Sequence, residues 1–188
     1  DESTDVIPLI AAYLGRPRDS YTPEDMEAVK AAFAKIRPHV RAFDSANYLN
    51  LIPNKELCVI NSWSGDYSTA KARAAEAGVE LNLGYFVPKT GAPAWVDMLC
   101  IPADSQRKDN AYKFLNYLME PEVIAKCTNF TNYANGNLAS KPFVAPAVLA
   151  NPAVYPDAAI MSRIYTLKPL KEENDRTLTE TWTAMKAG

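Results

Sequence analysis

The sequence predicts an α/β fold with a largely parallel sheet. Apolar runs typical of strands alternate with helical patterns along the middle of the chain, which is the arrangement that builds parallel sheets. The 188 residues are 48% hydrophobic and 22% charged, an ordinary composition for globular domains with a real core. The chain is long enough for one or two such domains.

Helices are predicted before the first strand. Residues 4–14 have helical periodicity behind a polar start. Thr22 is a good N-cap, with Pro23 at the first helical position and Asp25 at the third, so a helix is expected to about Ile36. Its expected apolar face is Met26, Val29, Phe33 and Ile36. Pro38 stops it, and a short helical stretch begins at Ser45.

Strands and helices then alternate. Residues 56–63, 79–88 and 94–102 are apolar, strand-like runs, and an Ala-rich helix ending near Gly78 separates the first two. An amphipathic helix is expected over 105–119 and another from Pro121. The inward positions expected for the 105–119 helix are Ala111, Phe114, Leu115, Leu118 and Met119.

The last quarter of the chain has two parts. Residues 141–157 are Pro-rich and expected to be irregular. A final helix is expected over about 171–186.

Composition excludes several classes of function. The net charge of −2 and the lack of a basic patch argue against nucleic acid, and no apolar run approaches the ~20 residues of a membrane span. A single histidine, His39, and no CxxC spacing argue against a metal site or a serine hydrolase. We therefore expect no metal and no cofactor. Buried, unpaired positions are expected for Cys58, Cys100 and Cys127, although a disulfide between two of them stays open.

Two pairs of tryptophan and aspartate stand out. Trp95 and Asp97 have the same parity in a strand-like run, and Trp63 and Asp66 lie at a strand-to-helix turn. An indole face attracts a cation and a carboxylate neutralises it, so both pairs suit a primary ammonium on an alkyl chain. The same acids could instead form the carboxylate pair of a glycoside hydrolase. Asp66 could also simply stabilise a helix N-terminus, and Trp63 could be a core residue.

Several stretches resemble the periplasmic polyamine-binding proteins of ABC importers, most closely the putrescine-binding type. They are CVINSWSGD, GAPAWVDMLCIPADSQRKDNAYKFLNYLMEPEVIA, YANGNLASKP and YPDAAIMSRIYTLK. The resemblance implies lobes like those of type II periplasmic binding proteins, a two-lobed clamshell with the ligand between α/β lobes. It covers about the C-terminal half of a family member, so the fold is expected to be incomplete here and the chain a fragment.

On that pattern the chain crosses between lobes. Residues 1–93 would belong to the second lobe, 94–140 would complete the first lobe after the hinge, and 141–188 would return to the second lobe.

The resemblance also implies roles for seven residues. Trp95 would stack on the alkyl chain of the ligand and Asp97 would pair with an amine. Trp63 would form a wall, and Asp66 would bind a terminal amine; an acid in this WxxD pattern is typical of the putrescine type.

Three further contacts follow from the resemblance. Asp5 would be an acid at the first helix, where the family usually has Glu. Ser45 and Tyr133 match a polar contact and a site tyrosine.

The implied protein is a receptor and not an enzyme. It would capture putrescine or a similar polyamine in the periplasm and deliver it to an inner-membrane ABC permease. Another cationic solute such as agmatine, or a truncated lobe without activity, remain alternatives. Apolar faces left by a missing half could drive self-association.

Overall fold

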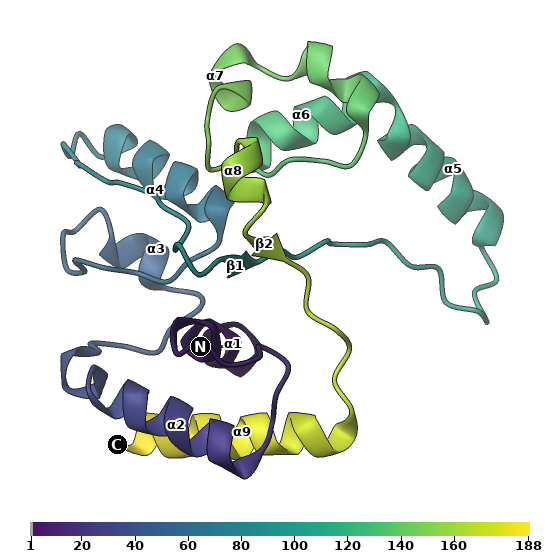
Figure 1. Cartoon of the computed structure of the whole chain (residues 1–188). Helices are drawn as coiled ribbons and strands as arrows, with labels where there is room; N and C mark the ends of the chain where they lie inside the picture. The colour runs from purple at the N-terminus through teal and green to yellow at the C-terminus, as the bar shows by residue number, and fades with distance from the viewer. Residues whose placement is uncertain (1) are drawn as a thin grey trace. The chain divides into compact units, whose positions relative to one another are not determined.

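The computed structural model describes residues 2–188, which form two compact units (Figure 1). Unit 1 contains the segment ending at Tyr48, residues Val87–Trp95 and residues Ala159–Gly188. Unit 2 contains Leu49–Phe86 and Val96–Ala158. The chain therefore passes between the units several times. The assignment of 1–93, 94–140 and 141–188 to two lobes stays a prediction.

Unit 1 is built around three long helices, α1 (Ser3–Tyr13), α2 (Pro23–Ala34) and α9 (Glu172–Ala187). The three pack on one another, and each contributes apolar side chains from one face. The helices predicted over 4–14, from Pro23 and over 171–186 are confirmed. The buried core consists of Ile7, Ala11, Met26, Val29, Phe33, Leu178, Trp182 and Met185.

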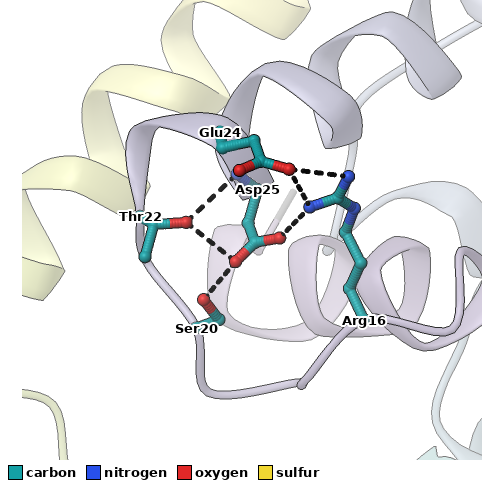
Figure 2. A network of polar contacts seen from close by, with 5 residues as sticks. All are labelled: Arg16, Ser20, Thr22, Glu24 and Asp25. Atoms are coloured by element: carbon teal, nitrogen blue, oxygen red, sulfur yellow. Dashed lines mark hydrogen bonds and ion pairs between the residues drawn. The ribbon is translucent and has the colours of Figure 1, made fainter.

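A network of polar groups fixes the start of α2 (Figure 2). As predicted, Thr22 is the N-cap, and its hydroxyl oxygen accepts a hydrogen bond of 3.2 Å from the Asp25 amide. The Asp25 carboxylate in turn accepts hydrogen bonds from the Ser20 and Thr22 hydroxyls and pairs with Arg16. These bonds, first that from Ser20, then those from Arg16 and Thr22, lower the pKa of Asp25 from 3.8 to about 2.

The Asp25 network makes the stability of the protein depend on pH. Because its folded pKa lies below the unfolded value, the ionised carboxylate stabilises the fold above the unfolded pKa of about 4. That contribution is lost as the pH falls from about 4 toward 2. We expect Asp25→Asn to lower the free energy of unfolding at pH 7, and the difference from the parent to shrink at pH 2.5.

Urea unfolding at the two pH values checks this expectation. Glu24→Gln is the matched control, because Glu24 also contacts Arg16 but its side chain is 83% exposed. If Asp25→Asn and the parent differ by the same free energy of unfolding at both pH values, the lowered pKa of Asp25 is not what stabilises the fold.

Unit 1 also holds the one sheet found among residues 2–188. It pairs β1 (Ala92–Pro93) with β2 (Ile164–Tyr165) in parallel, with Ala92 opposite Ile164 and Pro93 opposite Tyr165. The Ala94 amide continues the pairing by donating to the Tyr165 carbonyl at 2.7 Å. A 3-10 turn, η1 (Arg37–His39), follows α2 at Pro38, where the sequence predicts a stop.

Unit 2 is mostly helical. Its longer helices are α4 (Ser64–Glu76), α5 (Lys108–Met119) and α6 (Pro121–Thr131), all three predicted. Helix α4 ends before Gly78, whose φ of +66° suits glycine at that position. Helix α6 packs against α5 and against η2 (Leu138–Phe143). Three short helices complete the described elements. Helix α7 (Pro146–Leu149) and all of α3 (Tyr48–Leu51) except Tyr48 are in unit 2, whereas all of α8 (Ala158–Met161) except Ala158 is in unit 1. The segment 141–157, expected to be irregular, thus contains part of η2 and all of α7.

The strands predicted over 56–63, 79–88 and 94–102 are wrong: within residues 2–188 none of them is a strand, and Figure 1 draws arrows for β1 and β2 alone. The single bond from the Ala94 amide to Tyr165 is the end of the β1–β2 pairing. A strand exists only where a neighbour completes its hydrogen-bond ladder, and residues 2–188 supply no such neighbour for 56–63, 79–88 or the residues after Ala94. Their apolar side chains are accordingly uncovered, with Val59 86% and Met98 78% exposed.

One of these segments keeps the burial pattern of a strand. From Val79 to Phe86, half-buried and exposed residues alternate with a period of two. The Tyr67 hydroxyl of α4 donates to the Leu83 carbonyl at 3.2 Å, and the rings of Tyr67 and Tyr85 lie 5.6 Å apart. This segment therefore has the side-chain alternation of a strand, although the predicted hydrogen-bond ladder is absent.

Several burial predictions are also wrong for the same reason, a lack of covering neighbours. Phe114 and Met119 of α5 are 56% and 64% exposed, and Ile36 lies beyond the end of α2 and is 52% exposed. All three cysteines are exposed free thiols. Cys58 and Cys100 belong to the unpaired segments, and Cys127 lies on the open side of α6.

Candidate functional site

In unit 1, an aspartate and a tryptophan predicted for the site meet. Asp5 lies in the first turn of α1 and is half-buried, and Trp95 follows β1 with its side chain 52% exposed. The indole Nε1–H donates a hydrogen bond of 3.1 Å to Asp5 Oδ1. The two residues are 90 positions apart in the sequence.

Opposing effects act on the pKa of the Asp5 carboxyl group. Burial raises the pKa of its carboxyl group, the hydrogen bond from Trp95 lowers it, and the nearby Glu2 raises it again. A half-buried carboxylate with a raised pKa is poorly solvated. It therefore gains more from a cationic partner than a fully hydrated carboxylate would.

The small sheet positions Trp95. Pairing of β1 with β2 continues to Ala94, the residue before the indole. Gly91 begins this stretch with a φ of +93°, and a Cβ atom there would collide with the Arg163 carbonyl oxygen. Arg18 fastens the same region, because its guanidinium donates to the Thr90 carbonyl at 3.1 Å and lies 3.9 Å from the centre of the Tyr165 ring.

In unit 2, a second acid meets an aromatic residue. Asp66 lies in the first turn of α4, three residues after Trp63, which is at the N-cap position. Tyr133 follows Asn132, which ends α6 in the left-handed conformation. The Tyr133 hydroxyl donates to Asp66 Oδ1 at 3.3 Å. Burial, and after it the charge of Asp66, raise the pKa of Tyr133 to about 12, so the phenol keeps its proton and acts as a donor.

Gly65 makes this second pair possible. It is buried at the start of α4, and the edge of the Tyr133 ring occupies the space where a Cβ atom would lie. Any larger residue would displace the ring from Asp66. The glycine in WSGD is thus explained by close approach of a side chain, since its φ is not in the left-handed region.

The remaining predicted residues lie outside these two pairs. Asp97 is exposed in the unpaired segment after Trp95, so the expected strand that would set both side chains on one face is absent. Ser45 is half-buried in unit 1, at a turn where Asp44 Oδ1 accepts hydrogen bonds of 2.8 Å from the Ala46 and Asn47 amides. The roles of Asp97 and Ser45 stay predictions.

Residues missed in the sequence are Gly65, Arg18 and Tyr165. A glycine within the first turn of a helix is unfavourable, and that alone could have indicated a close approach at position 65. Arg18 and Tyr165 carry no local signal, because they meet across a separation of more than a hundred residues. Across residues 2–188, no cluster of three or more His, Cys, Asp or Glu could hold a metal ion.

Comparison with solved structures shows which fold the chain shares. The fold matches the spermidine/putrescine ABC transporter substrate-binding protein PotD from Streptococcus pneumoniae with a TM-score of 0.85 at 21% identity, covering all of this chain and 56% of that one. The Tp0655 (TpPotD) lipoprotein of Treponema pallidum matches with a TM-score of 0.79 at 17% identity. The fold is therefore that of a periplasmic-type binding protein, in part, as the sequence predicts.

The family follows from the sequence itself. Residues 4–156 match the model of the bacterial extracellular solute-binding proteins, and the chain belongs to this family. It is 37% identical over 188 residues to the putrescine-binding periplasmic protein SpuD of Pseudomonas aeruginosa (strain UCBPP-PA14) and 38% identical over 189 residues to PotF of Escherichia coli (strain K12). Each alignment covers all of this chain and 51% of the relative, so the chain spans about half their length.

A third relative carries a broader name. The putrescine/agmatine-binding protein of Pseudomonas aeruginosa is 32% identical, again over the whole chain. The resemblance to polyamine-binding proteins is thus confirmed. Within the part of the chain that the structure describes, no helix combines the length and apolar character needed to cross a bilayer.

Proposed function

We propose that this chain belongs to a receptor that binds putrescine or a similar polyamine for import by an ABC transporter. The observation that carries the proposal is the pairing of an acid with an aromatic group in each unit, Asp5 with Trp95 and Asp66 with Tyr133. Relatives aligned over the whole chain are named for binding putrescine. The pairs explain in physical terms how a polyamine would be held.

The Asp5–Trp95 pair suits an ammonium group attached to methylenes. The half-buried carboxylate supplies the opposite charge, and Trp95 is exposed to solvent. A cation near an indole face gains about 0.5–2 kcal/mol, with the larger values where water is excluded. Methylene groups would lie on the same ring and bury apolar surface.

The Asp66–Tyr133 pair offers the same chemistry with a different aromatic group. Tyr133 donates to one oxygen of the carboxylate and so fixes its orientation. Trp63 stands three residues before Asp66 at the N-cap of α4 and is half-buried. In this proposal Trp63 is the wall beside the ligand, and Asp66 receives an ammonium group.

Two further residues complete the proposed ligand contacts. Asp97 would pair with an amine and Ser45 would supply a polar contact, as in the family pattern. Micromolar affinity requires about 8 kcal/mol, which charge-assisted hydrogen bonds and cation–π stacking can supply once desolvation is subtracted. No bond is broken in such binding, so the proposed protein is not an enzyme.

The proposed setting is the periplasm, where the receptor would deliver its ligand to an inner-membrane permease. The family is one of extracellular proteins, which agrees with this setting. Exposed apolar side chains of unit 2, among them Val96, Leu99 and Phe114, also support self-association of the chain. Sedimentation over a range of protein concentrations checks that part, and a monomer throughout would refute it.

Calorimetric titration with a panel of amines tests the proposal. We expect saturable binding of putrescine, with agmatine and spermidine as competitors that bind less tightly. Binding should weaken with added salt, because it depends on charge. If agmatine binds more tightly than putrescine, agmatine replaces putrescine as the proposed ligand, and the class of ligand is unchanged. Absence of heat with every amine, from a chain that circular dichroism shows to be folded, would contradict the proposal for this chain.

A further inference from the structure

Thr128 is a buried polar residue near the end of α6, with 2% of its surface exposed. Both of its oxygen atoms accept hydrogen bonds from the chain that follows. The Thr128 carbonyl accepts the Asn132 amide at 2.9 Å, and the Thr128 hydroxyl oxygen accepts the side-chain amide Nδ2–H of Asn135 at 2.8 Å. Thr128 therefore holds both ends of the segment 132–135, which contains Tyr133.

The first end of this segment is fixed through the backbone. Asn132 has a φ of +59°, a left-handed conformation that asparagine adopts more readily than most residues, and it turns the chain out of α6. The Tyr133 amide then donates to the Thr131 hydroxyl oxygen at 3.4 Å. The chain therefore leaves the helix in a defined direction.

The second end is fixed through the side chain of Asn135, and both ends of its amide group take part. While Nδ2 donates to Thr128, Oδ1 accepts the Asn137 backbone amide at 2.8 Å. The same oxygen shares the Ser140 hydroxyl with the Asn137 carbonyl. Asn135 thus joins the hydroxyl of α6 to the start of η2, where Ser140 is also buried.

The placement of this segment matters for Tyr133. The ring of Tyr133 lies against Gly65, and its hydroxyl donates to Asp66 Oδ1 at 3.3 Å. A hydrogen bond of this length weakens further when the donor moves away. The position of the backbone at residue 133 therefore decides whether the Tyr133 hydroxyl reaches the carboxylate.

We propose that Thr128 is a positioning residue for Tyr133: its hydroxyl, through Asn135, holds the segment 132–135 so that the Tyr133 hydroxyl reaches Asp66. The consequence for ligand binding rests on the proposed function. Valine has the shape of threonine and would fill this buried position without a polar group to desolvate. The hydrogen bond to Asn135 explains why a hydroxyl stands there instead.

Two substitutions at position 128 separate this role from packing. Thr128→Val removes the hydroxyl and keeps the shape, whereas Thr128→Ser keeps the hydroxyl and removes a methyl group. Both change buried atoms, so both can alter stability. We expect putrescine affinity to fall about three- to tenfold in Thr128→Val, up to the effect of one lost hydrogen bond to a charged group, and to stay unchanged in Thr128→Ser. Equal affinity in Thr128→Val and the parent, or equal losses in both variants, would overturn the inference.

A Tyr133→Phe background shows whether Thr128 acts through the tyrosine. The hydroxyl that Thr128 positions is absent there, so Thr128→Val should cause no further loss of putrescine affinity. The same loss with and without the Tyr133 hydroxyl would mean that Thr128 affects binding by another route, which would also overturn the inference.

A third experiment needs no ligand. A methyl group at position 65 displaces the Tyr133 ring, and this displacement is resisted while the segment 132–135 is held. In Thr128→Val the segment is released, so Gly65→Ala should destabilise the protein less than it does in the parent, as measured by urea unfolding. In Thr128→Ser, Gly65→Ala should destabilise the protein as much as in the parent. An equal effect of Gly65→Ala in Thr128→Val and the parent would refute the inference, whereas a parent that binds no amine would count against the proposed function alone.

Discussion

Asp66→Asn is expected to weaken putrescine binding about a hundredfold, roughly 3 kcal/mol, while the chain stays folded. The substitution keeps the shape of the side chain and its hydrogen bond from Tyr133, which lies 3.3 Å away. It removes the negative charge that an ammonium group needs. Calorimetric titration of the variant measures the change directly.

The control for this prediction is Asp109→Asn. Asp109 lies in the first turn of α5, as Asp66 does in α4, and both acids interact favourably with their helix dipole. Both variants should therefore lose a similar fraction of a kcal/mol in stability, and Asp66→Asn alone should lose affinity. Equal affinities in the two variants would show that Asp66 acts only on its helix.

Gly65→Ala is expected to disrupt the Asp66–Tyr133 pair by displacing the Tyr133 ring. A methyl group at this position would occupy the place of the Tyr133 ring edge, so the ring must move away from Asp66. Overpacking of this kind typically costs about 1–3 kcal/mol, against a gain of up to about 1 kcal/mol from placing alanine in a helix. We expect a net loss of stability, measured by urea unfolding, and weaker putrescine binding.

The effect of Gly65→Ala on stability should change sign when the Tyr133 ring is removed. In a Tyr133→Ala background, Gly65→Ala should stabilise the protein, because the helical preference of alanine remains and the clash is gone. Gly136→Ala is the control, since no described atom lies within 4 Å of a Cβ placed there. If Gly65→Ala costs the same with and without the ring, the contact with Tyr133 is not what requires glycine.

The parts of the fold that the sequence predicts well are those fixed by neighbouring residues. Thr22 caps α2 through the Asp25 amide, Pro121 opens α6, and Gly78 follows the end of α4. Each of these depends on residues within one helical turn. Local chemistry was sufficient to place them.

The strands were mispredicted because pairing is not local. The run containing Val59 and the run containing Met98 have the composition of buried strands, yet their side chains are exposed. The composition of a segment indicates that it could be buried in a sheet, but it does not show whether another strand is there to pair with it. The two strands that do form, β1 and β2, are two residues each and have no sequence signal of their own.

The residues of the candidate site also divide into those predicted from local sequence and those that depend on contacts between distant residues. Trp63 and Asp66 were found from a short motif, since their positions at the start of α4 depend on local sequence. The contacts from Tyr133 to Asp66 and from Trp95 to Asp5 join residues 67 and 90 positions apart. Only the resemblance to a family suggested Asp5 and Tyr133 at all, and neither approach suggested Tyr165.

The most direct test of the acid–aromatic pairs is a putrescine titration followed at the three indole N–H signals by NMR. Trp95 is bonded to Asp5, Trp63 stands beside Asp66 in the chain, and Trp182 is buried in the helical core of unit 1. We predict that saturating putrescine shifts the Trp95 and Trp63 signals and leaves Trp182 in place. Shifts confined to Trp182, or equal in all three, would contradict the proposal that these acids and aromatic rings bind the ligand.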